Sequence, residues 1–185
     1  MTSQRIGLVH PGEMGISLAA TAQSSGHQVY WASEGRSTQT RKRAAQFNLQ
    51  DAQTFANLCA TCSLIVSVCP PHAAETVAQQ VLAHGFTGMY LDANAIAPQR
   101  AVHMSQAMAA AGIAFIDGGI IGVPAWTPGT TRLYLSGARA DEIAACFSAG
   151  PLETRIIGVD AGRASALKMC FAVRIVHKSE LVPFV

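Results

Sequence analysis

The chain alternates regularly between short apolar segments of strand character and longer segments whose apolar residues recur at helical spacing. The strand-like segments are residues 5–9, 29–32, 63–68, 88–92 and 113–117. Helical patterns follow them at residues 12–25, 38–47, 51–60, 72–84 and 98–111. Repeated strand–helix units are typical of parallel β-α-β connections. We therefore predict an α/β fold of the Rossmann type, with a doubly wound, mostly parallel sheet and helices on both faces.

The last third of the chain departs from this alternation. Residues 131–136 alternate less cleanly between polar and apolar residues, and they predict a late edge strand that runs antiparallel to the others. A short helix is expected at 141–148, a last strand at 154–159, and a helix from residue 161 onward. We expect a dinucleotide-binding domain over residues 1–160 and the start of an interdomain helix over residues 161–185.

Composition narrows the class of protein. Half of the 185 residues are hydrophobic and 13% are charged, which favours a folded chain with a sizeable core. The net charge of +2 argues against nucleic acid as the partner. No apolar run approaches the ~20 residues that cross a bilayer, so we expect no membrane partner and a soluble, cytoplasmic protein.

Five cysteines, an odd number, argue against a disulfide framework. Cys59 and Cys62 form a C-x-x-C motif, which raises the alternatives of a zinc site or a redox pair. However, no second pair lies at zinc-ribbon spacing and no nearby histidine completes a set of ligands. We therefore predict no metal site, and interpret the two cysteines as small residues that pack.

The most informative turn lies between the first strand and the first helix, where the chain runs His10-Pro11-Gly12-Glu13-Met14-Gly15. Dinucleotide-binding folds need glycines here for a tight turn, for close approach of the pyrophosphate and for helix–strand packing. Gly12 and Gly15 occupy the second and third positions of G-x-G-x-x-G, and His10 occupies the first. This predicts a diphosphate site, although a turn used only for packing is the alternative.

The turn after the second strand bears on the choice of cofactor. Glu34 could hold the ribose hydroxyls of NAD, since an acidic residue is expected about 20 positions after the glycines. Ser33, Arg36 and Ser37, with Arg41 one turn later, suit a 2′-phosphate better, because a guanidinium makes charge-assisted bonds to phosphate. We therefore favour NADP and leave NAD open.

Motifs in a fixed order carry a family resemblance. They are I-G-L-V-x-P-G-x-M-G at 6–15, Cys69-Pro70-Pro71, Asp92-Ala93-Asn94, the glycine-rich segment 115–122, Gly129-Thr130 and Gly162 with Lys168. In this order they resemble the 3-hydroxyacid dehydrogenases, the superfamily that includes 6-phosphogluconate and 3-hydroxyisobutyrate dehydrogenases. The resemblance covers essentially all of residues 5–172.

The resemblance implies an oxidoreductase that transfers a hydride between NAD(P) and a small-molecule substrate bearing a hydroxyl or carbonyl group. It places Lys168 as the catalytic general acid/base, a role that requires a lowered pKa. It places Asp117, Gly118 and Gly119 at the substrate, although Asp117 could instead cap a loop. The expected cofactor-binding residues are His10, Pro11, Gly12, Glu13, Met14, Ser33, Arg36, Ser37, Cys69, Pro70, Pro71 and Asn94.

Three departures from the family pattern open alternatives. Ile121 stands where the family has a serine that holds the substrate carboxylate, and Ala172 replaces an orienting asparagine. The family's helical C-terminal domain, which completes the active site and usually a homodimer, is expected to be missing after residues 161–185. A nucleotide-binding module without turnover is one alternative. Another is an α/β domain that binds no dinucleotide because His10 blocks the turn.

Trp126 could cover the nicotinamide or anchor its loop.

Overall fold

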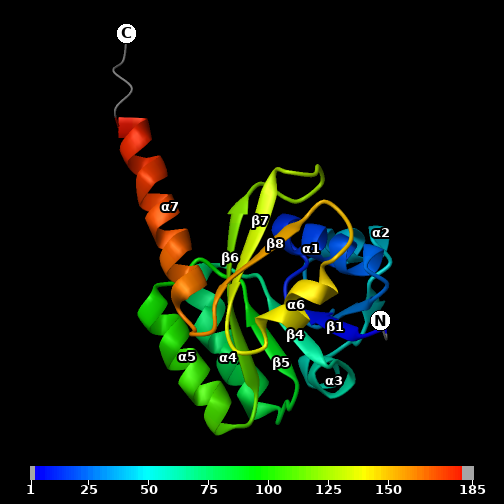
Figure 1. The fold of residues 1–185 in the computed structure, drawn as a ribbon. Helices are drawn as coiled ribbons and strands as arrows, with labels where there is room; N and C mark the ends of the chain where they lie inside the picture. Colours follow the sequence, from blue (N-terminus) through cyan, green and yellow to red (C-terminus); the bar gives the residue numbers. More distant parts are fainter. Residues whose placement is uncertain (1–2, 181–185) are drawn as a thin grey trace.

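A computed structural model describes residues 3–180 of the chain, with side chains as far as residue 173. Eight strands form one sheet between two layers of helices (Figure 1). The strands are β1 (Arg5–Leu8), β2 (Gln28–Trp31), β3 (Gln50–Asp51), β4 (Leu64–Ser67), β5 (Met89–Asp92), β6 (Ala114–Gly122), β7 (Thr131–Ser136) and β8 (Glu153–Gly158). This arrangement confirms the predicted Rossmann-type α/β fold.

The strand order is β3-β2-β1-β4-β5-β6-β7-β8, and every neighbouring pair is parallel except β6 and β7. The order reverses beside β1, because β2 lies on one side of it and β4 on the other. In open α/β sheets, ligands bind at such a switch point, outside the carboxyl ends of the strands. All four residues of β4 are buried, because helices cover this central strand on both faces.

The helices divide between the two faces of the sheet. They are α1 (Glu13–Ser24), α2 (Thr38–Gln46), α3 (Phe55–Thr61), α4 (Ala74–Ala83), α5 (Pro98–Ala110), α6 (Ala140–Cys146) and α7 (Arg163–Glu180), with a 3-10 turn at Pro71–Ala73. Side chains of α1, α2 and α6 pack in one core cluster, and those of α3, α4 and α5 in another. Figure 1 shows α7 beside α5, extending beyond the rest of the domain.

Several local predictions are confirmed. The helix predicted at 12–25 is α1, and Gly26 follows its end with a φ of 87°, the left-handed conformation that glycine adopts readily. The strand at 131–136 is β7, which is antiparallel to β6 as predicted. Its prediction as an edge strand is wrong, because β8 pairs with β7 on its other side and forms the edge.

Two segment boundaries also differ from the predictions. The helix predicted at 51–60 begins only at Phe55, because Gln50 and Asp51 pair with β2 as a short strand. The strand predicted at 113–117 continues to Gly122 through two glycines. Since β5 pairs with β6 only as far as Asp117, the second half of β6 projects beyond the carboxyl end of β5. This extension contributes to a second candidate site, beyond the carboxyl end of β5.

Candidate functional site

The turn from β1 into α1 leaves backbone N–H groups available at the switch point. The Gly12 N–H donates a hydrogen bond of 2.8 Å to the His10 carbonyl, which closes a tight turn before α1. Gly12 is the N-cap of α1, and no side chain caps this end of the helix. The first N–H groups of a helix have no partner within it, and the dipole favours an anion there. A Cβ atom at Gly12 would meet nothing within 4 Å, so this surface is open.

The other two motif positions serve the packing of the turn. A Cβ atom at Gly15 would overlap the His10 carbonyl oxygen, so glycine here lets α1 pack closely against β1. At the first position, the His10 side chain is partly buried, and its Nδ1 atom is buried without a hydrogen-bond partner. Burial, with a smaller effect of Arg36, lowers the pKa of His10 to about 4, so the imidazole is neutral at pH 7.

A cavity of about 380 Å³ lies over this turn. It is lined by residues 10–15, by Arg36 and Thr40, and by Val68, Cys69 and Pro70. His10 and Pro11 therefore line the hollow without filling it. Among the expected cofactor-binding residues, the structure brings together His10, Pro11, Gly12, Glu13, Met14, Arg36, Cys69 and Pro70. Thr40 and Val68 also line the cavity; Thr40 follows Arg36 by about one helical turn, a signal that the sequence contained.

The arginines near the start of α2 have different roles. The Arg36 Nη2 atom donates to the Val9 carbonyl at 3.0 Å, and its Nε atom is buried without a partner. Arg41 donates to the carbonyls of Ser33 and Arg36, at 2.6 and 3.3 Å. Arg43 donates to the Pro11 carbonyl at 3.3 Å. Arg41 and Arg43 thus hold the loops, and of these three only Arg36 lines the cavity.

The remaining expected cofactor residues lie around the cavity. Ser33 is buried, and Ser37 is exposed at the N-cap of α2, where its hydroxyl accepts from the Thr40 N–H at 3.2 Å. Pro71 is exposed and begins the 3-10 turn after β4.

Asn94 supports the cavity wall. Its Oδ1 atom accepts from the Cys69 N–H at 2.5 Å, and its Nδ2 atom donates to Asp92 at 2.9 Å and to the Ser67 hydroxyl at 3.1 Å. Burial raises the pKa of Asp92 to about 6. Since the Asn94 amide is buried and uses these bonds within the protein, it fixes the position of Cys69 and the turn that follows.

Asp117 lies beneath the second candidate site and anchors α7. It is fully buried, and its Oδ2 atom accepts from the N–H groups of Gly162 and Ser165, at 2.9 and 3.0 Å, and from the Ser136 hydroxyl at 3.1 Å. Its Oδ1 atom accepts from the Ser165 hydroxyl at 2.6 Å. These partners occupy the carboxylate, so its geometry agrees with the capping alternative, at the start of α7, rather than with contact to a substrate.

Gly119 and Gly118 allow this helix and the neighbouring strand to approach closely. A Cβ atom at Gly119 would lie 2.7 Å from the Ala164 carbonyl oxygen, and one at Gly118 would lie 2.9 Å from the Leu91 Cδ1 atom. Both glycines are buried within β6. Their contribution is therefore the tight packing of α7 and β5 against β6, which positions Lys168 one and a half turns along α7.

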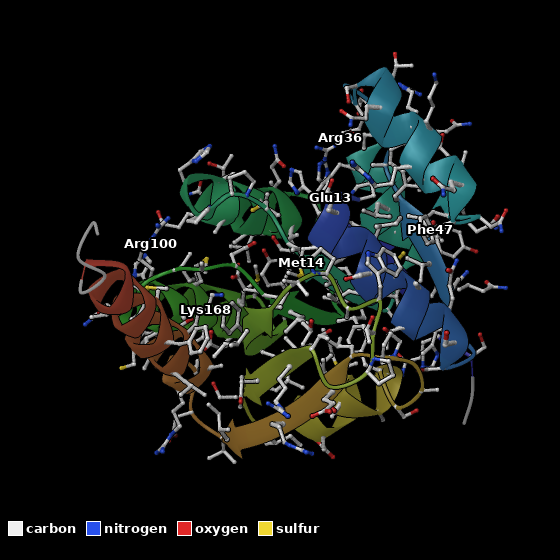
Figure 2. All side chains as sticks on the ribbon, turned by 90° about the horizontal axis from the view of Figure 1, so that it is seen from above. Glu13, Met14, Arg36, Phe47, Arg100 and Lys168 are labelled. Carbon is white, nitrogen blue, oxygen red and sulfur yellow. The ribbon has the colours of Figure 1, made fainter. Side chains whose placement is uncertain are left out.

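Lys168 lines a second cavity, of about 540 Å³, beyond the end of β5. Its Nζ atom donates to the Ile120 carbonyl at 2.5 Å, and burial lowers its pKa. The other lining residues come from the end of β6, the following loop, β7 and α7: Ile121, Gly122, Val123, Thr130, Arg132, Tyr134, Phe171 and Ala172. In Figure 2, Glu13 and Met14 lie between Arg36 and Lys168.

Arg132 and Tyr134 were not predicted as site residues. They alternate along β7, so they face the same side of the sheet, and β7 pairs them with Ile121 and Gly119 of β6. The alternation in T-R-L-Y-L was the available signal. It does not reveal which face carries α7, since that depends on the distant anchor at Asp117.

Other predicted features lie away from both cavities. Trp126 stacks on Phe47 with ring centroids 5.3 Å apart, so it anchors the loop between β6 and β7. Cys59 and Cys62 are buried in the core, where burial raises their pKa values to about 11 and 12. Within residues 3–180, no three His, Cys, Asp or Glu side chains gather as a group that could hold a metal ion. No helix in this part of the chain has the length and apolar character to span a membrane.

An open helix N-terminus at the switch point of a parallel sheet, with a hollow above it, defines a dinucleotide-binding α/β domain. Residues 5–146 match the NAD binding domain of 6-phosphogluconate dehydrogenase, and the chain belongs to this family. No curated protein sequence matches the chain.

Solved structures share the fold. A conserved protein of unknown function, itself reported as structurally similar to 3-hydroxyacid dehydrogenases, has a TM-score of 0.78 at 27% identity, over 92% of this chain and 64% of its own. An imine reductase variant from Myxococcus stipitatus, in complex with NAD+, has a TM-score of 0.78 at 18% identity, over 96% and 62%. A 3-hydroxyisobutyrate dehydrogenase from Mycobacterium tuberculosis has a TM-score of 0.79 at 16% identity, over 94% and 60%. The chain therefore spans about 60–64% of the length of these relatives.

Proposed function

We propose that the chain binds NADP(H) and contributes the nucleotide-binding part of an oxidoreductase, with Lys168 as the general acid/base. The observation that carries this proposal is the pairing of two sites on one edge of the sheet. One is the open N-terminus of α1 under a cavity of about 380 Å³, and the other is the half-buried Lys168 beyond the end of β5. The first suits a diphosphate and the second suits proton transfer.

The preference for NADP rests on Arg36. Its guanidinium lines the cavity, and its buried Nε atom lacks a partner. The hydroxyls of Ser37 and Thr40 lie at the start of α2, directly after it. Glu34, the residue that would favour NAD, is exposed and does not line the cavity. A 2′-phosphate would therefore gain a charge-assisted hydrogen bond from Arg36, which is the stronger class of such bonds.

Lys168 would exchange a proton with the oxygen atom of the substrate's reacting group. Burial lowers the pKa of its ammonium group, which makes the proton easier to donate to a carbonyl and the neutral amine easier to form. Its bond to the Ile120 carbonyl fixes the direction of the side chain. When bound, NADPH supplies the hydride, and the apolar residues around Lys168 would contact the body of the substrate.

Exchange of Arg36 tests the cofactor assignment. Arg36→Gln should weaken NADPH binding at least tenfold and leave NADH binding within about twofold, because a hydrogen bond to a charged group contributes about 1.5–3 kcal/mol. Calorimetric titration with both cofactors measures this. Lys42→Gln is the matched control, since it removes the same charge from the same basic segment and Lys42 lies outside the cavity. Equal affinity of the Arg36 variant and the wild type for NADPH would contradict the assignment.

A second candidate function is nucleotide binding without turnover. The observation that favours it is the short bond from the Lys168 ammonium to the Ile120 carbonyl, which occupies one of its three N–H groups within the protein. NADPH consumption with a panel of carbonyl and imine compounds separates the two functions. Turnover that is lost in Lys168→Met, with NADPH affinity unchanged, supports the oxidoreductase; NADPH binding without any turnover supports the module.

A further inference from the structure

The cavity beside Lys168 has apolar walls and an excess of positive charge. Ile121, Val123, Phe171 and Ala172 supply much of its apolar lining, while Lys168 and Arg132 supply the charges. No aspartate or glutamate is among its lining residues. A ligand that suits these walls has an apolar body and at least one negative group, because an unpaired cation next to apolar surface attracts an anion.

The charges around Arg132 do not balance. Its Nε atom donates to the Glu153 Oε2 atom at 2.9 Å, and the Arg155 Nη2 atom lies 3.8 Å from the same oxygen. Glu153 therefore shares one negative charge between two arginines. Within residues 3–173, the Nη atoms of Arg132 make no hydrogen bond to the protein. Counting Lys168, three positive charges face one negative charge, and a pair of N–H donors remains available in the geometry that suits a carboxylate.

Arg132 and Lys168 reach the cavity from different elements. The register pairs Arg132 on β7 with Ile121 at the end of β6, whereas Lys168 comes from α7, which packs on β6 at Gly119. One ligand can therefore meet both cations, with its anionic group at one and its reacting group at the other. The Ile121 side chain offers no hydrogen bond beside Arg132, and the nearby Thr130 and Tyr134 offer only hydroxyls, so the guanidinium is the charged group of this wall.

We propose that Arg132 is a specificity-determining residue of this cavity and that it pairs with the carboxylate of a substrate whose body is apolar. The proposal rests on the proposed function, because Lys168 then faces the carbonyl or hydroxyl group of the same molecule. Arg132 thus selects acids over neutral compounds of equal length, while Ile121 and Phe171 accommodate the chain. Glu153 competes with the substrate for the guanidinium and limits its affinity.

Hexanoate and hexanamide are suitable probes, since they share an apolar chain and differ in charge. We expect the cofactor-free chain to bind hexanoate at least tenfold more tightly than hexanamide, measured by an NMR titration of the backbone amides. Arg132→Gln should abolish this preference. The control is Arg139→Gln, which removes an exposed arginine that pairs with a different glutamate, Glu142, and should retain the preference, because neither residue lines the cavity.

A substitution that is expected to strengthen binding complements these variants, because damage to the fold would not produce tighter binding. Glu153→Gln should tighten hexanoate binding several-fold, because it removes the carboxylate that competes for Arg132. Equal binding of the two probes by the wild type overturns the proposal. So does a preference that survives in Arg132→Gln, or one that disappears equally in Arg139→Gln. An unchanged unfolding midpoint for each variant shows that the fold is retained.

Measurement of NADPH binding in the same samples separates this proposal from the proposed function. NADPH binding without discrimination between hexanoate and hexanamide defeats the assignment of Arg132 alone. Discrimination of the two probes without any NADPH binding supports Arg132 and defeats the proposed cofactor.

Discussion

The two ends of the candidate site are built in different ways. The cavity at α1 takes six of its eleven lining residues from one continuous segment, residues 10–15, whose turn is closed by a hydrogen bond over two positions. The cavity at Lys168 depends on side chains far apart in the chain, because Asp117 binds Ser165, 48 positions away, and Ser136 binds the Ala164 N–H, 28 positions away. The turn at the base of the first site is therefore encoded locally, although residues after β2 and β4 complete its walls, whereas the second site depends throughout on distant packing.

Removal of Asp117 should have the largest effect and is the sharpest test of this contrast. Asp117→Ala leaves the buried N–H groups of Gly162 and Ser165 without partners, at about 1–3 kcal/mol for each buried unsatisfied group. We expect the free energy of unfolding to fall by about 3 kcal/mol or more, measured in urea.

The control for Asp117 is Asp160→Ala, at the same end of α7. Asp160 is exposed and pairs with Arg163 at the surface, so its loss should cost under about 1 kcal/mol. Equal losses for the two variants would show that Asp117 does not anchor the helix.

Substitutions of the two glycines in the turn should distinguish the packing role of Gly15 from the role of Gly12 in ligand binding. Gly15→Ala forces a Cβ atom onto the His10 carbonyl, and we expect a stability loss of about 2 kcal/mol, as for other overpacked sites. Gly12→Ala places a Cβ atom in open space with φ at −74°, so its stability loss should stay under about 1 kcal/mol. Its NADPH affinity should nevertheless fall, because the new methyl group stands where the diphosphate approaches. Thermal unfolding and calorimetry on both variants would expose a wrong assignment if their effects were reversed.

His10, in the turn before α1, should make a smaller, pH-dependent contribution to the free energy of unfolding. Its pKa in the folded chain, about 4, lies below the ordinary 6.5, so the unfolded chain binds the extra proton between these values. The contribution to stability is present above pH 6.5 and is lost as the pH falls towards 4. We expect about 1–2 kcal/mol, allowing for partial exposure.

His10→Gln should remove this part of the pH dependence. The comparison must be made between variant and wild type, because Asp92 acts in the opposite direction. Its raised pKa, about 6, gives stability that is present below pH 3.8 and is lost as the pH rises through 6. Unfolding in urea between pH 4 and 7 measures both slopes, and identical slopes for the two chains would refute the role of His10.

The sequence was sufficient for the features that depend on local pattern. The alternation of apolar segments predicted the parallel sheet, and Gly12 and Gly15 predicted the turn that forms the first cavity. It was insufficient where distant packing decides. The strand predicted at 113–117 stops before Gly118 and Gly119, although the observed strand continues through both glycines. Pairing with β7 keeps them extended in β6, and α7 and β5 pack too closely there for any side chain.

The same limit applies to the side chains of the second cavity. Nothing local indicates that Asp117 faces the start of α7, or that Arg132 lines a cavity with Lys168. The position of β8 outside β7 was also missed, since a strand's neighbours are set by how the chain returns to the sheet rather than by its own residues.

The hydrogen bonds of Asp117 fix the first turn of α7, whereas its far end projects from the domain. Lys168 lies five residues after Arg163, or about 7.5 Å along the axis, whereas the end at Glu180 lies about 26 Å along it. A sideways displacement of the far end is therefore reduced to less than a third at the lysine backbone. If the projecting part of α7 were displaced, the ammonium group of Lys168 would therefore move little from its place beside β6 (Figure 1).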